Sequence, residues 1–250
     1  MNDGGSGLLA VLGEAAAAVQ AALGRLEDWG PAGTRPGQYR SDLVADEAVV
    51  AVLDRAGLGT LSEESGLHHP DRPVVVVVDP LDGSTNAARG IPWFACSLCA
   101  VDRDGPAAAL VVDLARGTRY EAVRGGGASR DGTAVRPSRC STLRSSVVGL
   151  SGYPRRYLGW KQFRALGAAA LDLCAVGAGH LDAYIDCSRD AHGPWDYLAG
   201  VLVCREAGAA VVDAWDRDLV TLEPSGRRTP LAAATPALLE QVVGARLRLG

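Results

Sequence analysis

The chain has 250 residues, a formal net charge of −4, 48% hydrophobic residues and 22% charged residues. These values indicate a soluble globular protein with enough chain for one domain or two fused lobes, and the negative charge gives no support to nucleic-acid binding. The six cysteines fit no zinc-site spacing and no basic leader opens the chain, so a reducing cytoplasm is the expected location. No apolar run approaches the roughly 20 residues of a membrane span, so no membrane partner is expected.

Taken in chain order, the pattern of apolar residues predicts a mixed α/β protein with a single domain over residues 1–250, whose lobes cover about 8–145 and 146–250. Residues 1–7 are expected to be disordered, and residues 28–38 form a Gly- and Pro-rich loop. The predicted helices cover 8–26, a segment from about Leu43 or Asp46 to Ala56, a basic and aromatic stretch over 153–166, and 167–177, 195–207 and 236–247. The predicted strands cover 74–78, 93–101, 107–113, 118–122, 146–150 and 181–185, and a last strand region begins at Val211.

The five consecutive valines Val74 to Val78 are typical of a strand buried on both faces. The strand is predicted to stop at Asp79-Pro80, because proline cannot donate to a sheet ladder. The run D-P-L-D-G-S-T-N, from Asp79 to Asn86, then places two carboxylates three residues apart on a turn, followed by small hydroxyl residues. Carboxylates bind hard cations, and glycine with hydroxyl groups suits the approach of a phosphate, so the stretch indicates a metal-phosphate site.

This run matches the D-P-[LI]-D-G-[ST]-T-N signature of the inositol monophosphatase family. Two further blocks resemble that family's signatures in the expected order: L-S-E-E-S-G at Leu61–Gly66, and W-D-Y-L-A-G from Trp195 with R-E-A-G-A from Arg205. The resemblance covers about residues 42–234. It implies a layered α-β-α-β-α sandwich, two or three Mg²⁺ ions, hydrolysis of a small phosphate monoester, a homodimer and inhibition by Li⁺.

The resemblance also implies metal ligands, each carried over to its matching position. Glu63, Asp79 and the Leu81 carbonyl would hold one ion, and Asp79, Asp82 and Asp196 the second. A third, weaker ion would rest on Glu63 with water.

Further roles follow from the same match. Gly83, Ser84 and Thr85 would bind the phosphate, and Asp186 with Gly167 and Ala168 would lie beside the leaving alcohol. The catalytic residues implied are Ser84, with Asp46 behind it to orient the attacking water, and Glu64, which would support the water network.

The chain departs from the family pattern in three places. The segment before Asp46 is shorter than usual, the loop over 38–41 lacks a lysine often found there, and the stretch from Cys187 to Pro194 is longer. These departures leave the third ion and the alcohol half of the substrate open. Residues 167–186 also resemble archaeal-type enzymes that hydrolyse both inositol-1-phosphate and fructose-1,6-bisphosphate.

Inositol-1-phosphate is the leading substrate. Fructose-1,6-bisphosphate, histidinol phosphate and 3′-phosphoadenosine nucleotides are alternatives, although no clear adenine site is visible. A non-catalytic binding protein on the same fold is an alternative of another class. Retention of the four carboxylates Glu63, Asp79, Asp82 and Asp196 favours catalysis.

Overall fold

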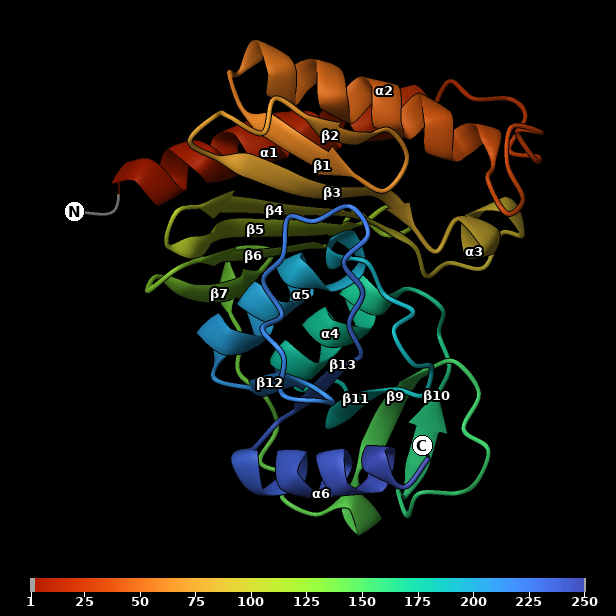
Figure 1. The fold of residues 1–250 in the computed structure, drawn as a ribbon, viewed down its shortest axis with the longest axis vertical. Coiled ribbons are helices and arrows are strands. Elements are labelled where there is room, and N and C mark those ends of the chain that lie inside the picture. The colour runs from red at the N-terminus through yellow and green to blue at the C-terminus, as the bar shows by residue number, and fades with distance from the viewer. Residues whose placement is uncertain (1–2, 250) are drawn as a thin grey trace.

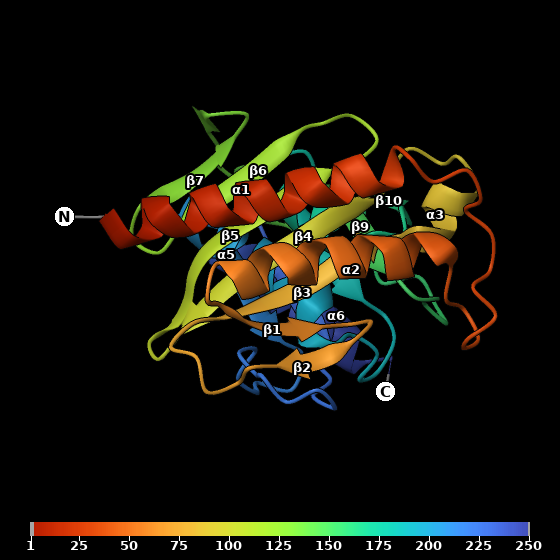
Figure 2. The ribbon, with the colours of Figure 1, turned by 90° about the horizontal axis from the view of Figure 1, so that it is seen from above.

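The computed structural model describes residues 3–249, which form five layers in the order helix, sheet, helix, sheet, helix (Figure 1). Helices α1 (Asp3–Leu23) and α2 (Arg40–Arg55) lie side by side on the outer face of the first sheet (Figure 2). Helices α4 (Ala169–Gly177) and α5 (Pro194–Ala207) lie between the two sheets, and a C-terminal helix covers the second sheet. This arrangement is the α-β-α-β-α sandwich that the sequence resemblance implied.

The first sheet has the spatial order β2-β1-β3-β4-β5-β6-β7-β8. Strands β1 and β3 pair in parallel, and the other neighbouring strands pair antiparallel. The strands are β1 (Gly59–Ser62), β2 (Gly66–His68), β3 (Val75–Asp82), β4 (Ala95–Asp102), β5 (Gly105–Asp113), β6 (Arg119–Val123), β7 (Gly127–Arg130) and β8 (Thr133–Ala134).

The second sheet has the order β10-β9-β11-β13-β12. Its strands are β9 (Val147–Ser151), β10 (Gln162–Arg164), β11 (Ala183–Asp186), β12 (Ala210–Asp213) and β13 (Pro230–Ala233). The remaining helices are the short α3 (Ser84–Ala88), a 3-10 turn at Leu143–Ser145, and α6 (Pro236–Leu247). Helix α6 begins as predicted, because the Thr235 hydroxyl accepts a hydrogen bond from the Leu238 N–H at 3.3 Å and Pro236 follows the cap.

Strand β3 supplies side chains to two separate cores. Val76 and Val78 belong to the core beneath α1 and α2, whereas Val75 and Val77 belong to the core that contains α4 and α5. Successive side chains of a strand point to opposite faces of the sheet, so a run of valines can serve both layers. Burial on both faces therefore holds the end of β3, where the acidic run begins, in a rigid position.

Strand β3 does not stop at Asp79-Pro80, as the sequence predicted, but continues to Asp82. Its pairing with β4 shifts register between Asp79 and Asp82. A proline is tolerated at such an irregularity because the ladder is interrupted there.

The expectation of disorder over residues 1–7 is wrong for residues 3–7, which belong to α1, while Met1 and Asn2 lie outside the described residues. Helix α1 also contradicts the expectation that no apolar run reaches membrane-spanning length, since Gly4–Leu23 does so by length and composition. The same test is passed by core helices of soluble proteins, and four α1 residues at helical spacing are fully buried: Leu12, Ala15, Ala16 and Val19.

The helix predicted over residues 153–166 is absent from the described structure. This segment is a loop that ends in the short strand β10, which pairs in parallel with β9 at the edge of the second sheet. Pro154 and Gly159 disfavour a helix here, and Tyr153, Tyr157 and Phe163 are exposed rather than gathered on one buried face.

The contact between α4 and α5 leaves no room for a side chain at Gly200. A Cβ atom there would lie 2.6 Å from Leu173 Cβ. We expect Gly200→Ala to destabilise the protein, because overpacking costs about 1–3 kcal/mol, which outweighs the gain in helix propensity of about 1 kcal/mol. The control is Gly244→Ala in α6, whose nearest neighbour would be Arg248 Nη1 at 3.8 Å and which should be neutral or stabilising. Denaturant unfolding measures both free energies, and equal stability of the two variants would contradict the packing.

Candidate active site

Three acidic side chains from distant parts of the chain meet at the end of β3. Glu63 follows β1, Asp79 lies in β3 and Asp196 lies in the first turn of α5. One carboxylate oxygen of each residue lies within 4.8 Å of those of the other two, so the three could hold a metal ion together. The structure thus brings together three of the predicted metal ligands.

Backbone N–H groups orient these carboxylates. Asp79 Oδ1 accepts a hydrogen bond from the Leu81 N–H at 3.0 Å, and Asp196 Oδ2 accepts one from the Gly193 N–H at 2.7 Å. Each bond uses one carboxylate oxygen and leaves the other available to a ligand. Asp82 lies outside the triad, and its Oδ2 accepts a bond of 2.8 Å from the Ala170 N–H in the first turn of α4.

Burial and crowding raise the pKa values of Glu63, Asp79 and Asp82. Burial, followed by the charges of Asp196 and other nearby acids, raises the pKa of Glu63 to about 8. Burial and the charge of Asp196 raise the pKa of Asp82 to about 7, and burial with the charge of Glu63 raises that of Asp79 well above its ordinary value. A group of oxygen donors that resists ionisation at neutral pH is a good fit for a divalent cation, which would replace the bound protons.

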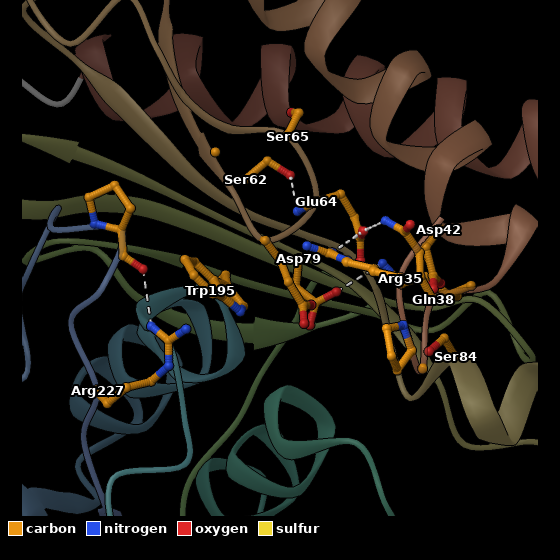
Figure 3. Close-up of a pocket in the computed structure, with 16 residues that line it drawn as sticks. Arg35, Gln38, Asp42, Ser62, Glu64, Ser65, Asp79, Ser84, Trp195 and Arg227 are labelled. Carbon is orange, nitrogen blue, oxygen red and sulfur yellow. Dashed lines mark hydrogen bonds and ion pairs between the residues drawn. The ribbon is translucent and has the colours of Figure 1, made fainter. Parts of the chain in front are cut away.

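A cavity of about 540 Å³ opens beside the triad. In Figure 3, Asp79 lies near its centre, with Asp42 and Ser84 on one side and Trp195 and Arg227 on the other. Leu81, which was predicted to ligate metal through its carbonyl, also lines this cavity.

Glu64 also lines this cavity and connects it to the loop between α1 and α2. Its carboxylate is bound by Arg35 and Gln38, both from this loop and both lining the cavity. Glu64 therefore anchors the loop at the site in addition to any part it has in ordering water.

The two acids at the start of α2 have different surroundings. Asp46 is buried, accepts a hydrogen bond from the Ser62 hydroxyl and is not among the residues that line the cavity. Asp42, one turn earlier, does line it. Asp42 Oδ2 accepts a bond of 2.8 Å from the Tyr39 N–H, and its buried Oδ1 has no partner among the described residues. Burial raises the pKa of Asp42 to about 6.

A second, smaller cavity of about 240 Å³ lies beside Asp82. Asp82, Gly167 and Ala168 line it, together with His192. Gly83 packs closely here, since a Cβ atom on it would lie 3.1 Å from the Gly167 carbonyl, and its φ of +86° favours glycine. The structure thus brings the predicted phosphate loop together with two of the predicted substrate contacts.

Two predicted contacts lie away from the cavity walls. Thr85 is exposed, lines neither of the two cavities and has its hydroxyl 3.4 Å from that of Tyr39. Asp186 is fully buried and is not among the residues that line the second cavity. His192 does line this cavity, and its Nε2 lies 3.8 Å from Asp186 Oδ2.

His192 also approaches the metal-ligand candidates, with Nδ1 3.3 Å from Asp196 Oδ2. Burial lowers the pKa of His192, but the hydrogen bond to Asp196 and the charges of Asp196, Asp186 and Asp82 outweigh it and raise the pKa to about 9. Sequence reasoning missed Arg35, Asp42 and His192, because none lies within a recognised signature. The one sequence signal for Asp42 was the segment D-L-V-A-D, Asp42–Asp46, which is shorter than the family pattern before Asp46.

Comparison with known proteins decides the family. Residues 40–247 match the model of the inositol monophosphatase family. The chain belongs to this family. A fructose-1,6-bisphosphatase/inositol-1-monophosphatase of Thermococcus kodakarensis is 36% identical over 82% of the chain and 80% of the relative, and a Nus factor SuhB of Xylella fastidiosa is 32% identical over 75% and 74%. The inositol monophosphatase structure from Anabaena superposes with a TM-score of 0.80 at 27% identity, covering 98% of this chain and 97% of that one.

Membership in this family and the relatives named for this activity make the protein a phosphatase, a hydrolase of phosphoric monoesters. The predicted fold and the predicted enzyme class are therefore confirmed.

The raised pKa values predict that the metal-free protein loses stability as the pH rises, and that a bound metal ion offsets this loss. Without metal, the folded protein retains protons on Glu63 and Asp82 that the unfolded chain releases near the ordinary values of 4.5 and 3.8. The stability that comes from these retained protons is fully present below the ordinary pKa values and is lost as the pH rises through about 7 to 8. The raised pKa of His192 also makes stability fall as the pH rises.

Thermal unfolding of chelator-treated protein should therefore show falling stability between pH 5.5 and 8.5, by at least about 1.4 kcal/mol, the value of a shift of one pKa unit. A divalent cation should stabilise more at pH 8 than at pH 6. Glu63→Gln should flatten the profile of the metal-free protein. A metal-free stability that rises with pH over this range would contradict the assignment.

Proposed function

We propose that the protein is a Mg²⁺-dependent phosphatase of a small polyol phosphate, with inositol-1-phosphate as the leading substrate. One observation carries this proposal. Glu63 and Asp79 of the acidic triad line a larger cavity, suited to water and metal. Asp82 and His192, the latter 3.3 Å from the third triad member Asp196, line a small cavity suited to the leaving alcohol.

The donor set supports Mg²⁺, because every candidate ligand is an oxygen and hard oxygen ligands suit this ion. Glu63, Asp79 and the Leu81 carbonyl would hold one ion, Asp79, Asp82 and Asp196 a second, and Glu63 with water a third. Bound Mg²⁺ neutralises phosphate oxygens, makes a bound water more acidic and stabilises the leaving alkoxide.

The chain's own groups would position the reactants. Gly83 and Ser84 would bind the phosphate through N–H and hydroxyl groups, and Thr85 through its N–H, at the turn where the left-handed backbone of Gly83 lets an anion approach. We assign the orientation of the attacking water to Ser84 and Asp42, because both line the larger cavity and Asp42 keeps one carboxylate oxygen without a partner among the described residues. Asp46 would then support Ser62 and the Glu63-Glu64 turn.

Fructose-1,6-bisphosphate is the second candidate substrate, because the Thermococcus relative is named for both activities. Its second phosphate would need a cation, and Arg35 and Arg227 both line the larger cavity. A non-catalytic role fits less well, since the four carboxylates remain in place, although other relatives are named Nus factors. We further propose that the protein is cytoplasmic, forms a homodimer and is inhibited by Li⁺.

Phosphate release by the purified protein tests this function directly. With Mg²⁺ present, the panel should contain inositol-1-phosphate, fructose-1,6-bisphosphate, histidinol phosphate and 3′-phosphoadenosine 5′-phosphate. We expect turnover of inositol-1-phosphate with the highest kcat/KM and its loss when a chelator is added. Release of phosphate from none of the four would contradict the proposed substrate class.

Removing a carboxylate charge from the triad should abolish turnover while the fold survives. We expect Asp79→Asn and Asp196→Asn each to lower kcat by about a thousandfold or more, because metal-assisted stabilisation is worth several kcal/mol. Asp104→Asn is the matched control, since this carboxylate is exposed and remote from the site. Steady-state kinetics beside a thermal melt measure both properties, and activity near wild type in either triad variant would overturn the ligand assignment.

A pair of variants distinguishes the roles of Asp42 and Asp46, both of which lie in α2. If Asp42 orients the water, Asp42→Asn should lower kcat by about 10²–10⁴-fold with little change in KM. Asp46→Asn keeps an acceptor for the Ser62 hydroxyl and should lower kcat far less. The reverse order of effects would restore Asp46 to the role that the sequence suggested.

A further inference from the structure

His192 connects the acidic cluster to the wall of the smaller cavity. Its Nδ1 lies 3.3 Å from Asp196 Oδ2, and its Nε2 lies 3.1 Å from the Ser151 hydroxyl and 3.2 Å from the Tyr184 hydroxyl. His192 and Ser151 line this cavity, whereas Tyr184 is fully buried and does not. One imidazole nitrogen therefore faces the metal ligands, and the other faces a hydroxyl on the cavity wall.

The segment that carries His192 is held from several sides. The Asp190 N–H donates to Thr229 at 3.0 Å, and the guanidinium of the fully buried Arg246 donates to the carbonyls of Asp186 and Ser188 at 2.6 and 3.1 Å. A side chain fixed in this way can act as a rigid hydrogen-bonding group toward a ligand.

The lining of the smaller cavity indicates what kind of group it accepts. Its polar side chains are Asp82, Ser151, Asp172 and His192, and no arginine, lysine, phenylalanine, tyrosine or tryptophan of the described chain lines it. A second phosphate would find no arginine or lysine there, and a planar base would find no phenylalanine, tyrosine or tryptophan ring to stack on. The volume of about 240 Å³ is small for a ligand pocket and suits a compact polyhydroxyl group.

We propose that His192 and Ser151, rather than Asp186, are the specificity-determining residues that bind hydroxyl groups of the leaving alcohol. The inference rests on the proposed phosphatase function and deepens it, because it names a neutral polyol as the leaving group. Asp186 acts indirectly: it is fully buried, its Oδ1 is bound to the Ser188 N–H at 2.9 Å, and its Oδ2 lies toward His192. A site built to pair with hydroxyl groups discriminates against an analogue that lacks them, because its own polar groups then stay unpaired.

Two substrates of the same ring size isolate this effect. Inositol-1-phosphate carries hydroxyl groups around the ring, and cyclohexyl phosphate carries none. The measured quantity is the ratio of kcat/KM for the first substrate to that for the second, in the wild type, Ser151→Ala and His192→Gln. The matched control is His180→Gln, since His180 is exposed beyond the end of α4 and lines neither cavity.

We expect Ser151→Ala to lower the ratio about tenfold, mainly through a higher KM for inositol-1-phosphate, as loss of one buried hydrogen bond predicts. His192→Gln should lower it at least as much, and His180→Gln should leave it within twofold of the wild type. Ser151→Ala removes only a hydroxyl group, so it tests the proposal even if His192→Gln does not fold.

An unchanged ratio in Ser151→Ala and His192→Gln would overturn the inference, even if His192→Gln slowed both substrates equally through Asp196. The proposed phosphatase function would survive that result, because the wild type would still hydrolyse inositol-1-phosphate. Failure of the wild type to release phosphate from either substrate would overturn both the inference and the proposed function.

Discussion

Mutual repulsion among carboxylates is the constraint on which the site depends. Glu63, Asp79, Asp82 and Asp196 converge at the end of one buried strand, and burial together with their charges raises the pKa values of the first three. Such a cluster is unfavourable in a metal-free protein at neutral pH. The five layers hold it in place because β3 is packed on both faces and cannot relax away. This repulsion favours metal binding, because a divalent cation neutralises the carboxylates and is bound more tightly as a result.

Helix N-termini also compensate this charge. Asp42 and Asp196 lie in the first turns of α2 and α5, and each accepts the N–H of the residue three positions earlier, Tyr39 and Gly193. Asp82 accepts the Ala170 N–H from the start of α4. Three helices from two layers therefore place their N-terminal turns beside acidic residues of the site, and the positive ends of their dipoles favour acidic side chains and an anionic substrate alike. The same bonds fix the carboxylates and leave oxygen atoms available to ligands.

Much of this site could be predicted from the sequence because its central ligands lie in short contiguous signatures. Glu63, Asp79 and Asp196 were named in that way, and the structure brings them together. Asp42 could not be distinguished from Asp46, because the choice depends on where α2 begins and which acid then faces the cavity. Arg35 and His192 lie in loops without periodicity, and their positions depend on Glu64, Asp196 and Ser151, which are distant in sequence or belong to other elements. The end of β3 was misplaced because the effect of Pro80 depends on the register shift against β4.

Proton release on metal binding tests this account most directly. Mg²⁺ can be titrated calorimetrically into the metal-free protein at pH 7 in two buffers of different ionisation enthalpy, which counts the protons displaced. Because the pKa values of Glu63 and Asp82 are raised to about 8 and about 7, binding should release protons, and Asp196→Asn should weaken it strongly. Binding with no release of protons, or binding unaffected by Asp196→Asn, would contradict a site made of crowded carboxylates that share one cation.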